Sequence, residues 1–172
     1  MDRDEIFRVL RAFEASGLAY TLIGATAMGF HGLVRATEDV DFFIRATPDN
    51  IERLRTALRS AYDDDPHIAE ITTADLLGDY PAVRYYPPTG DLYFDVLTRL
   101  GEAASFETVD AQIKEVEGTK VSVATPAALY RLKKGTVHMP VQKFRFDRGD
   151  EPRGVFKFRT IEEAQRARDL HR

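Results

Sequence analysis

The residues best suited to chemistry in this sequence are three aspartates in apolar surroundings. Two of them, Asp39 and Asp41, flank Val40 within an apolar run. In an extended strand, side chains two positions apart point to the same face and lie about 6–7 Å apart. Two carboxylates in this arrangement suit a hard divalent cation such as Mg²⁺, which prefers oxygen ligands.

The third aspartate, Asp95, lies between Phe94 and Val96 in a second apolar run. A lone carboxylate is costly to bury there unless it is paired or binds a metal. If the two runs form neighbouring strands, the three acids converge at one edge of a sheet. Such a cluster suits phosphoryl or nucleotidyl transfer, in which metal ions neutralise phosphates and align the attacking and leaving oxygens.

An acid pair alone is weak evidence, because such pairs are common on solvated strands. A glycine upstream strengthens it: Gly24 ends an apolar run, and 13 residues separate the next residue, Ala25, from Asp39. Glycine at a strand-to-helix turn lets the backbone approach a phosphate closely, and a helix start offers free N–H groups. The sequence therefore predicts a phosphate cradle facing a metal-binding strand.

The elements that must position these residues follow from the spacing of apolar side chains. Helices are predicted at residues 3–16, 25–30, 47–61 and 125–134, and strands at 20–23, 40–44, 82–86, 92–98, 113–116 and 120–123. This order describes an α/β (α+β) fold, a small mixed β-sheet with flanking helices.

The length of 172 residues suits one domain. We expect residues 1–135 to form the catalytic domain and residues 136–172 to be a basic C-terminal extension of it. The sequence contains no cysteine, which excludes disulfides and thiolate metal sites and fits a reducing compartment. No signal peptide or membrane-length apolar run is evident. These features predict a soluble, cytoplasmic protein with no membrane partner.

Charge is distributed unevenly along the chain. The net charge is −4, yet the segment from Arg131 to Arg172 has twice as many basic as acidic residues. A basic tail on an acidic body is typical of contact with a polyanion such as RNA. A merely solvated C-terminus accounts for the same pattern equally well, and both interpretations stay open.

Taken together, these motifs resemble those of the polymerase-β-type nucleotidyltransferase superfamily. Its pattern is a glycine after an apolar residue, a small residue, a spacer, a D-x-D, and a single acid in a later apolar strand. The likeness is greatest to the small bacterial branch that contains AbiEii and MenT-like toxins. In that branch an Arg-x-Thr commonly precedes the first aspartate, as Arg35 and Thr37 do here. The detailed match covers residues 20–45 and 92–98, and the fold of the superfamily agrees with the predicted elements.

The resemblance implies a role for each matching residue. It assigns metal ligation to the three acids, with the third also able to help deprotonate the acceptor hydroxyl. It places the glycine turn, and the Arg-x-Thr residues with it, beside the bound nucleotide, and it places a lysine of a later helix near the triphosphate. The metal ligands would be Asp39, Asp41 and Asp95. The residues beside the nucleotide would be Gly24, Ala25, Arg35 and Thr37. The lysine would be Lys133, with Lys134 as its competitor.

Two departures from the family pattern affect these expectations. Ala25 stands where relatives have Gly or Ser, so we expect weaker phosphate binding rather than its loss. After Gly135 the chain leaves the usual pattern of charged positions on a final helix. The nucleotide or acceptor site on that side is therefore not predicted.

The function implied by the resemblance is Mg²⁺-dependent (or Mn²⁺-dependent) transfer of a nucleoside monophosphate from an NTP to a hydroxyl of RNA. The tRNA 3′ end is the favoured acceptor, and the protein would be a toxin with a cognate antitoxin as partner. One alternative is an antitoxin-type adenylyltransferase that modifies a partner toxin, a protein acceptor. A second is an inactive nucleotidyltransferase-fold domain that serves as a binding module.

Overall fold

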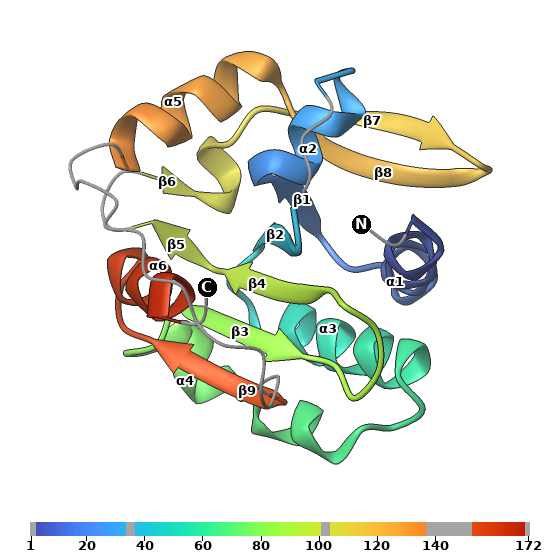
Figure 1. Cartoon of the computed structure of the whole chain (residues 1–172), viewed down its shortest axis with the longest axis vertical. Coiled ribbons are helices and arrows are strands. Elements are labelled where there is room, and N and C mark those ends of the chain that lie inside the picture. Colours follow the sequence, from blue (N-terminus) through green and yellow to red (C-terminus); the bar gives the residue numbers. More distant parts are fainter. Residues whose placement is uncertain (1–2, 34–36, 101–103, 137–152, 171–172) are drawn as a thin grey trace.

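A computed structural model describes residues 3–33, 37–100, 104–136 and 153–170. Its centre is a seven-stranded mixed sheet with the strand order β7-β8-β1-β2-β4-β3-β9 (Figure 1). The strands are β1 (Tyr20–Ile23), β2 (Asp39–Ile44), β3 (Ala82–Tyr86), β4 (Tyr93–Leu97), β7 (Ala111–Val116), β8 (Thr119–Ala124) and β9 (Gly154–Phe158). A separate two-stranded ribbon joins β5 (Arg99–Leu100) and β6 (Ala104–Ser105).

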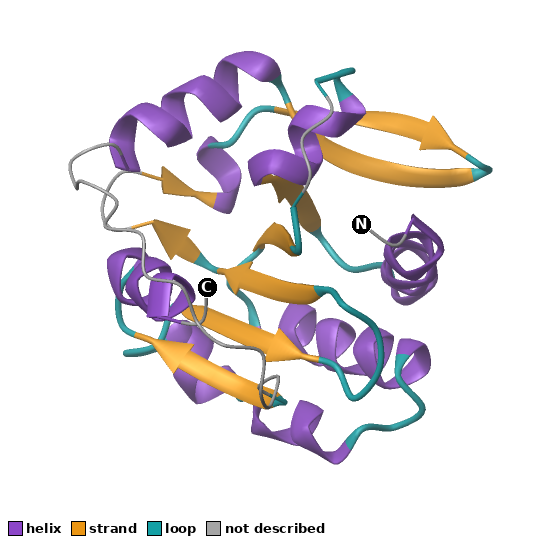
Figure 2. Ribbon diagram, viewed as in Figure 1, coloured by secondary structure: helices purple, strands orange, loops and turns teal. Residues whose placement is uncertain are grey.

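Helices flank this sheet (Figure 2). They are α1 (Arg3–Ser16), α2 (Gly24–Phe30), α3 (Pro48–Ala61), α4 (Thr73–Leu77), α5 (Pro126–Thr136) and α6 (Ile161–Leu170), with 3-10 turns η1 (Pro66–Glu70) and η2 (Phe106–Thr108). The mixed sheet with flanking helices confirms the predicted fold class. None of the described helices combines the length and the apolar character that a membrane crossing requires.

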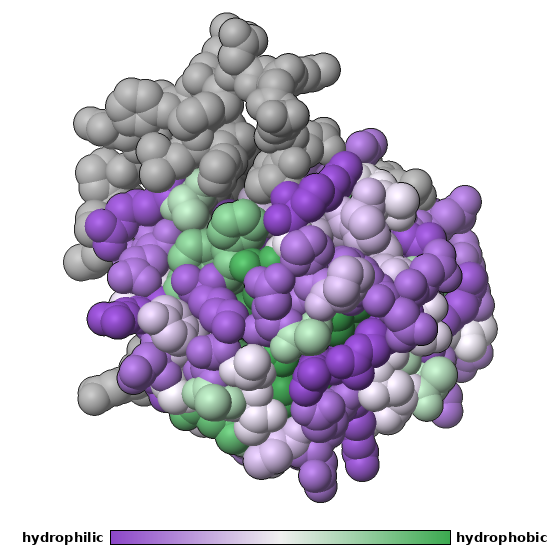
Figure 3. All heavy atoms as spheres, turned by 90° about the horizontal axis from the view of Figure 1, so that it is seen from below, coloured by the Kyte–Doolittle hydropathy of each residue, from purple (hydrophilic) through white to green (hydrophobic). Residues whose placement is uncertain are grey.

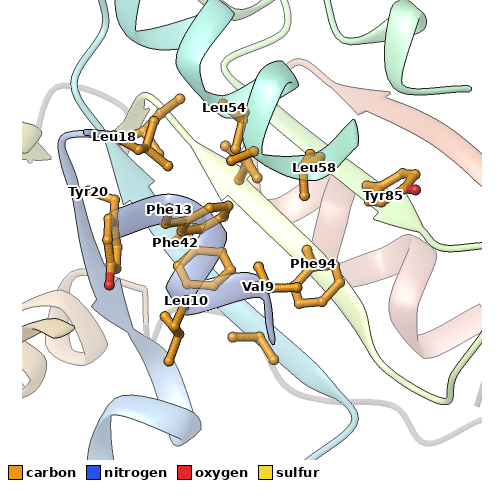
Figure 4. Close-up of a cluster of buried hydrophobic side chains, with 14 of the residues drawn as sticks. Val9, Leu10, Phe13, Leu18, Tyr20, Phe42, Leu54, Leu58, Tyr85 and Phe94 are labelled. Atoms are coloured by element: carbon orange, nitrogen blue, oxygen red, sulfur yellow. The ribbon is translucent and has the colours of Figure 1, made fainter. Parts of the chain in front are cut away.

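One face of the sheet carries the main hydrophobic core. The amphipathic helices α1 and α3 cover this face, and their apolar stripes meet the alternate residues of the strands (Figure 4). Phe42 of β2 is fully buried, with its ring 4.8 Å from that of Phe13 of α1 and 6.1 Å from that of Phe94 of β4. Each such side chain contributes about 1.5–3 kcal/mol by leaving water. The strands β2 and β4 are therefore anchored in the main core.

The opposite face carries a smaller apolar cluster and the acids. Phe43, Ala82 and Leu97 of the sheet pack there with Ala128 of α5. Because successive side chains of a strand alternate between faces, Asp41 and Asp95 point to the same side as Phe43 and Leu97. This face is called the acid face below.

The C-terminal elements were not predicted from the sequence. Strand β9 pairs antiparallel with β3 and forms an edge of the sheet. Helix α6 follows it and packs against β3 and β9. The face seen from below is mainly hydrophilic, with apolar areas interrupted by hydrophilic side chains (Figure 3).

Candidate active site

The register of two parallel strands brings the predicted acids together on one face. Asp41 of β2 is the Cα partner of Asp95 of β4, and Asp39 is the partner of Tyr93. Paired residues of neighbouring strands point to the same side, so all three carboxylates belong to the acid face. Asp39 and Asp95 are buried, whereas Asp41 is half-buried.

Gly24 lies directly against one of these carboxylates. It follows β1, whose Ile23 pairs with Asp41, and it adopts a φ of +69° where it opens α2. A Cβ at this position would overlap the Oδ2 and Cγ atoms of Asp41. The backbone angle therefore favours glycine here, and an added Cβ would displace the Asp41 carboxylate. Ala25 comes next, half-buried in the first turn of α2.

Two threonines fix the position of Asp39. The Thr37 hydroxyl donates a hydrogen bond to Oδ1 of Asp39. The Thr26 hydroxyl of α2 donates to the backbone carbonyl of the same aspartate at 3.3 Å. Thr37 was predicted to bind the nucleotide. In the structure its hydroxyl contacts the carboxylate of Asp39. Thr26 was missed, because nothing in its sequence context marks it.

Asp95 forms a two-pronged ion pair with an arginine that sequence reasoning also missed. Arg84 of β3 donates from Nε to Oδ1 at 2.7 Å and from Nη2 to Oδ2 at 2.8 Å. The two residues are antiparallel Cα partners, and Arg84 is only 1% exposed. An available signal was the single charge within the otherwise apolar and aromatic run 82–86. The buried carboxylate of Asp95 is thus paired with a cation, which is one of the two ways to offset the cost of its burial; the other is metal binding.

The environment keeps this arginine charged. Burial acts to lower the pKa of Arg84, but the hydrogen bonds and the negative charge of Asp95 outweigh it, and the net shift is upward. The pKa of the neighbouring Tyr86 is also raised, mainly by burial, so its phenol stays neutral. Arg84 and Asp95 therefore form a full ion pair on the acid face.

Of the two basic residues predicted for the site, Lys133 and Arg35, the structure describes only Lys133. Lys133 lies in the last turn of α5 and is exposed. Helix α5 packs on the acid face through Ala128 and Leu132, which places the lysine on an element of that face. Arg35 lies outside the described residues.

The donor atoms of the site fit a divalent cation only in part. Asp39 and Asp41 offer carboxylate oxygens on one face of a rigid strand, which suits Mg²⁺. Within the described ranges, however, no three His, Cys, Asp or Glu side chains gather closely enough to hold a metal. Both oxygens of Asp95 accept hydrogen bonds from Arg84.

The close approach of Gly24 to Asp41 yields a first prediction. Gly24→Ala is expected to abolish nucleotidyl transfer, because its methyl group displaces the Asp41 carboxylate. The left-handed backbone adds a stability loss of more than about 1 kcal/mol.

The matched control for this change is Gly118→Ala. Gly118 in the β7–β8 turn has a similar φ of +73° but no atom within 4 Å of an added Cβ. It should lose stability and keep activity, as measured by thermal unfolding and by nucleotide transfer. Equal activities of the two variants would contradict the proposed importance of the Gly24 contact.

Carboxylates in register on neighbouring strands, beside a glycine turn, form the arrangement expected of enzymes that transfer nucleotides. A sequence model of the family "Nucleotidyl transferase AbiEii toxin, Type IV TA system" matches residues 8–138. The chain therefore belongs to this family and is a nucleotidyltransferase. The matched range includes the predicted site residues and ends before β9 and α6.

A comparison with solved structures gave a crystal structure of a Thermotoga maritima protein proposed to be a nucleotidyltransferase. The match covers 99% of this chain and 94% of the other, with 14% sequence identity and a TM-score of 0.45. No curated protein matches the sequence.

Proposed function

We propose that the protein transfers a nucleoside monophosphate from an NTP to a hydroxyl group of RNA, with Mg²⁺ or Mn²⁺ as its cofactor. The observation that carries this proposal is the register of Asp41 with Asp95, with Gly24 packed against the Asp41 carboxylate. In the reaction, the acceptor oxygen bonds the α-phosphorus and loses its proton, and pyrophosphate leaves.

The residues of the acid face have separate roles in this proposal. Asp39 and Asp41 would hold the cation, and Thr37 and Thr26 fix the position of Asp39 through their hydroxyls. When bound, the cation neutralises phosphate charge and aligns the attacking and leaving oxygens. We place the phosphates of the nucleotide beside the turn at Gly24.

Three further roles belong to the same proposal. Ala25 follows the glycine turn, and its backbone would contribute to the phosphate cradle. Lys133 would contact the triphosphate from α5. Asp95 would complete the metal site and help to deprotonate the acceptor hydroxyl. Arg35 is proposed as a nucleotide contact on the grounds of sequence alone.

We favour the 3′ end of tRNA as the acceptor. Single-stranded RNA ends present splayed bases and free hydroxyls, which a shallow site can engage. The basic C-terminal part of the chain suits an RNA partner, since lysine and arginine neutralise phosphates. Three of its basic residues, Lys143, Arg145 and Arg148, lie outside the described residues. The family belongs to toxin–antitoxin systems, so we propose that this enzyme is a toxin with a cognate antitoxin and acts in the cytoplasm, where tRNA is found.

We further propose that residues 136–172 extend the domain formed by residues 1–135. Strand β9 supports this view, because it completes the edge of the sheet beside β3. The Arg84 contact with the carbonyl of Ala164 in α6 supports it as well.

Sequencing tRNA 3′ ends from cells that express the protein without its partner tests the choice of acceptor. We expect added nucleotides on the 3′ ends and slowed growth. Slowed growth with unextended tRNA, and nucleotide attached to a protein, would favour the protein-modifying alternative. Unmodified tRNA and unmodified protein would favour the binding module.

A further inference from the structure

The pairing of Arg84 with Asp95 has a consequence for the metal site, and it rests on the proposed function. Both partners are almost completely buried, and both carboxylate oxygens accept from the guanidinium. A two-pronged contact of this kind is among the stronger charge-assisted hydrogen bonds in proteins. Both oxygens of Asp95 are therefore occupied by Arg84 in this structure.

A divalent cation and a guanidinium cannot share this carboxylate without cost. Like charges repel, and the repulsion is larger in a buried site than in water. Asp41 is in register with Asp95, so a cation held by the acids of β2 would lie near Arg84. We therefore expect the Asp95 carboxylate to bind the cation or Arg84 with both oxygens, but not both partners at once.

One nitrogen of the guanidinium, with its two N–H groups, is left without an acceptor among the described residues. This nitrogen is Nη1 of Arg84, and it is buried. An unsatisfied buried donor is costly, so the paired state is not the best that this guanidinium can reach. An oxygen of an incoming triphosphate is an acceptor of the required kind.

The C-terminal helix holds the arginine in the paired state. Nη2 of Arg84 also donates to the carbonyl of Ala164 in α6 at 3.2 Å. The rings of Tyr93 and Phe158 flank the guanidinium, with centroids 4.8 Å and 5.6 Å from Cζ. These contacts come from β4, which carries Asp95 itself, and from the C-terminal elements β9 and α6.

We propose that Arg84 competes with the divalent cation for Asp95, so that Asp95 enters the metal site only when Arg84 releases it. Arg84 is thus a positioning residue that controls how many carboxylates the metal site has. The contact with α6 biases the site towards the two-carboxylate state.

Metal binding by the purified protein tests this directly, by titration with Mn²⁺ followed by electron paramagnetic resonance. Arg84→Gln is expected to bind Mn²⁺ roughly tenfold more tightly, a coupling typical of residues in contact. Asp95→Asn should remove this gain, so the double variant should bind no more tightly than Asp95→Asn alone. Equal affinities of the wild type and Arg84→Gln would overturn the proposal.

Further measurements keep the outcome interpretable if Arg84→Gln folds poorly. Arg84→Lys keeps the charge but loses the two-pronged geometry, so its affinity should be intermediate. In the wild-type protein, saturating Mg²⁺ should shift the NMR resonance of the Arg84 Nε–H group. An unmoved resonance would contradict competition whether or not the variants fold.

The proposed metal site has its own control. Asp41→Asn should weaken Mn²⁺ binding in every background. If it does not, the metal site and the proposed function fail together. If it does while Arg84→Gln changes nothing, only the competition fails.

Discussion

Replacing Asp41 with alanine is expected to lower the rate of nucleotidyl transfer by about 10³-fold or more, because the loss of a metal ligand removes several kcal/mol of transition-state stabilisation. The fold should survive. Asp41 is half-buried on the acid face, whereas its neighbour Phe42 faces the main core. Transfer activity and thermal unfolding of the same preparation check both parts of this expectation.

In cells, the wild-type protein expressed without its partner should slow growth, and Asp41→Ala should not. The matched control is Asp49→Ala, since Asp49 is an exposed aspartate in the first turn of α3, across the sheet from the acids. The Asp49 variant should remain toxic. If Asp41→Ala were as toxic as the wild type, toxicity would not depend on nucleotide transfer.

The second large effect concerns stability. Phe42→Ala is expected to destabilise the protein by about 3–5 kcal/mol, the range for truncating a buried aromatic side chain. Phe42 is fully buried, and its ring contacts those of Phe13, Tyr20 and Phe94. Urea unfolding measures the loss.

Phe156→Ala is the control, because it removes the same atoms from a partly exposed site. Phe156 of β9 is 39% exposed and meets Tyr86 edge-on at 5.6 Å. Its removal should cost clearly less than that of Phe42, because Phe156 buries less apolar surface on folding. Similar losses for both variants would show that the core between α1, α3 and the sheet contributes less than its burial indicates.

Phe42 also connects stability with the site. It belongs to the main core and is next to Asp41 in β2, so its packing fixes the strand that carries two of the three predicted metal ligands. A destabilised variant should therefore lose activity at temperatures below its unfolding midpoint, because a small displacement of catalytic groups is enough to slow a reaction.

Much of the fold could be predicted from local patterns. The apolar runs at residues 40–44 and 92–98 predict buried strands, and the stripe of α1 predicts an amphipathic helix, because these patterns depend on neighbours in sequence. The four helices predicted before residue 136, the mixed sheet and the family are confirmed. The roles of the individual site residues stay predictions.

The features of the site that were not predicted depend on residues far apart in the sequence. Arg84 meets Asp95 only because β3 and β4 are antiparallel partners, and Thr26 reaches Asp39 only because α2 lies against β2. Arg84 stands out locally as the single charge in an apolar and aromatic run, but neither pairing can be predicted from residues near in sequence. The elements β9 and α6 were missed for another reason. β9 has a lysine between two phenylalanines, and α6 is mostly polar, so neither stands out as an apolar segment.

The central claim, that this protein moves a nucleotide onto RNA through the acids of β2 and β4, is tested most directly with purified components. The protein is incubated with Mg²⁺, tRNA and each of the four triphosphates in turn, labelled at the α-phosphate. We predict that label from at least one triphosphate appears on the tRNA 3′ end, with one pyrophosphate released for each nucleotide added, and that Asp41→Ala transfers none. Folded wild-type protein that labels no RNA from any triphosphate, or Asp41→Ala that labels it as well as the wild type, would contradict the claim.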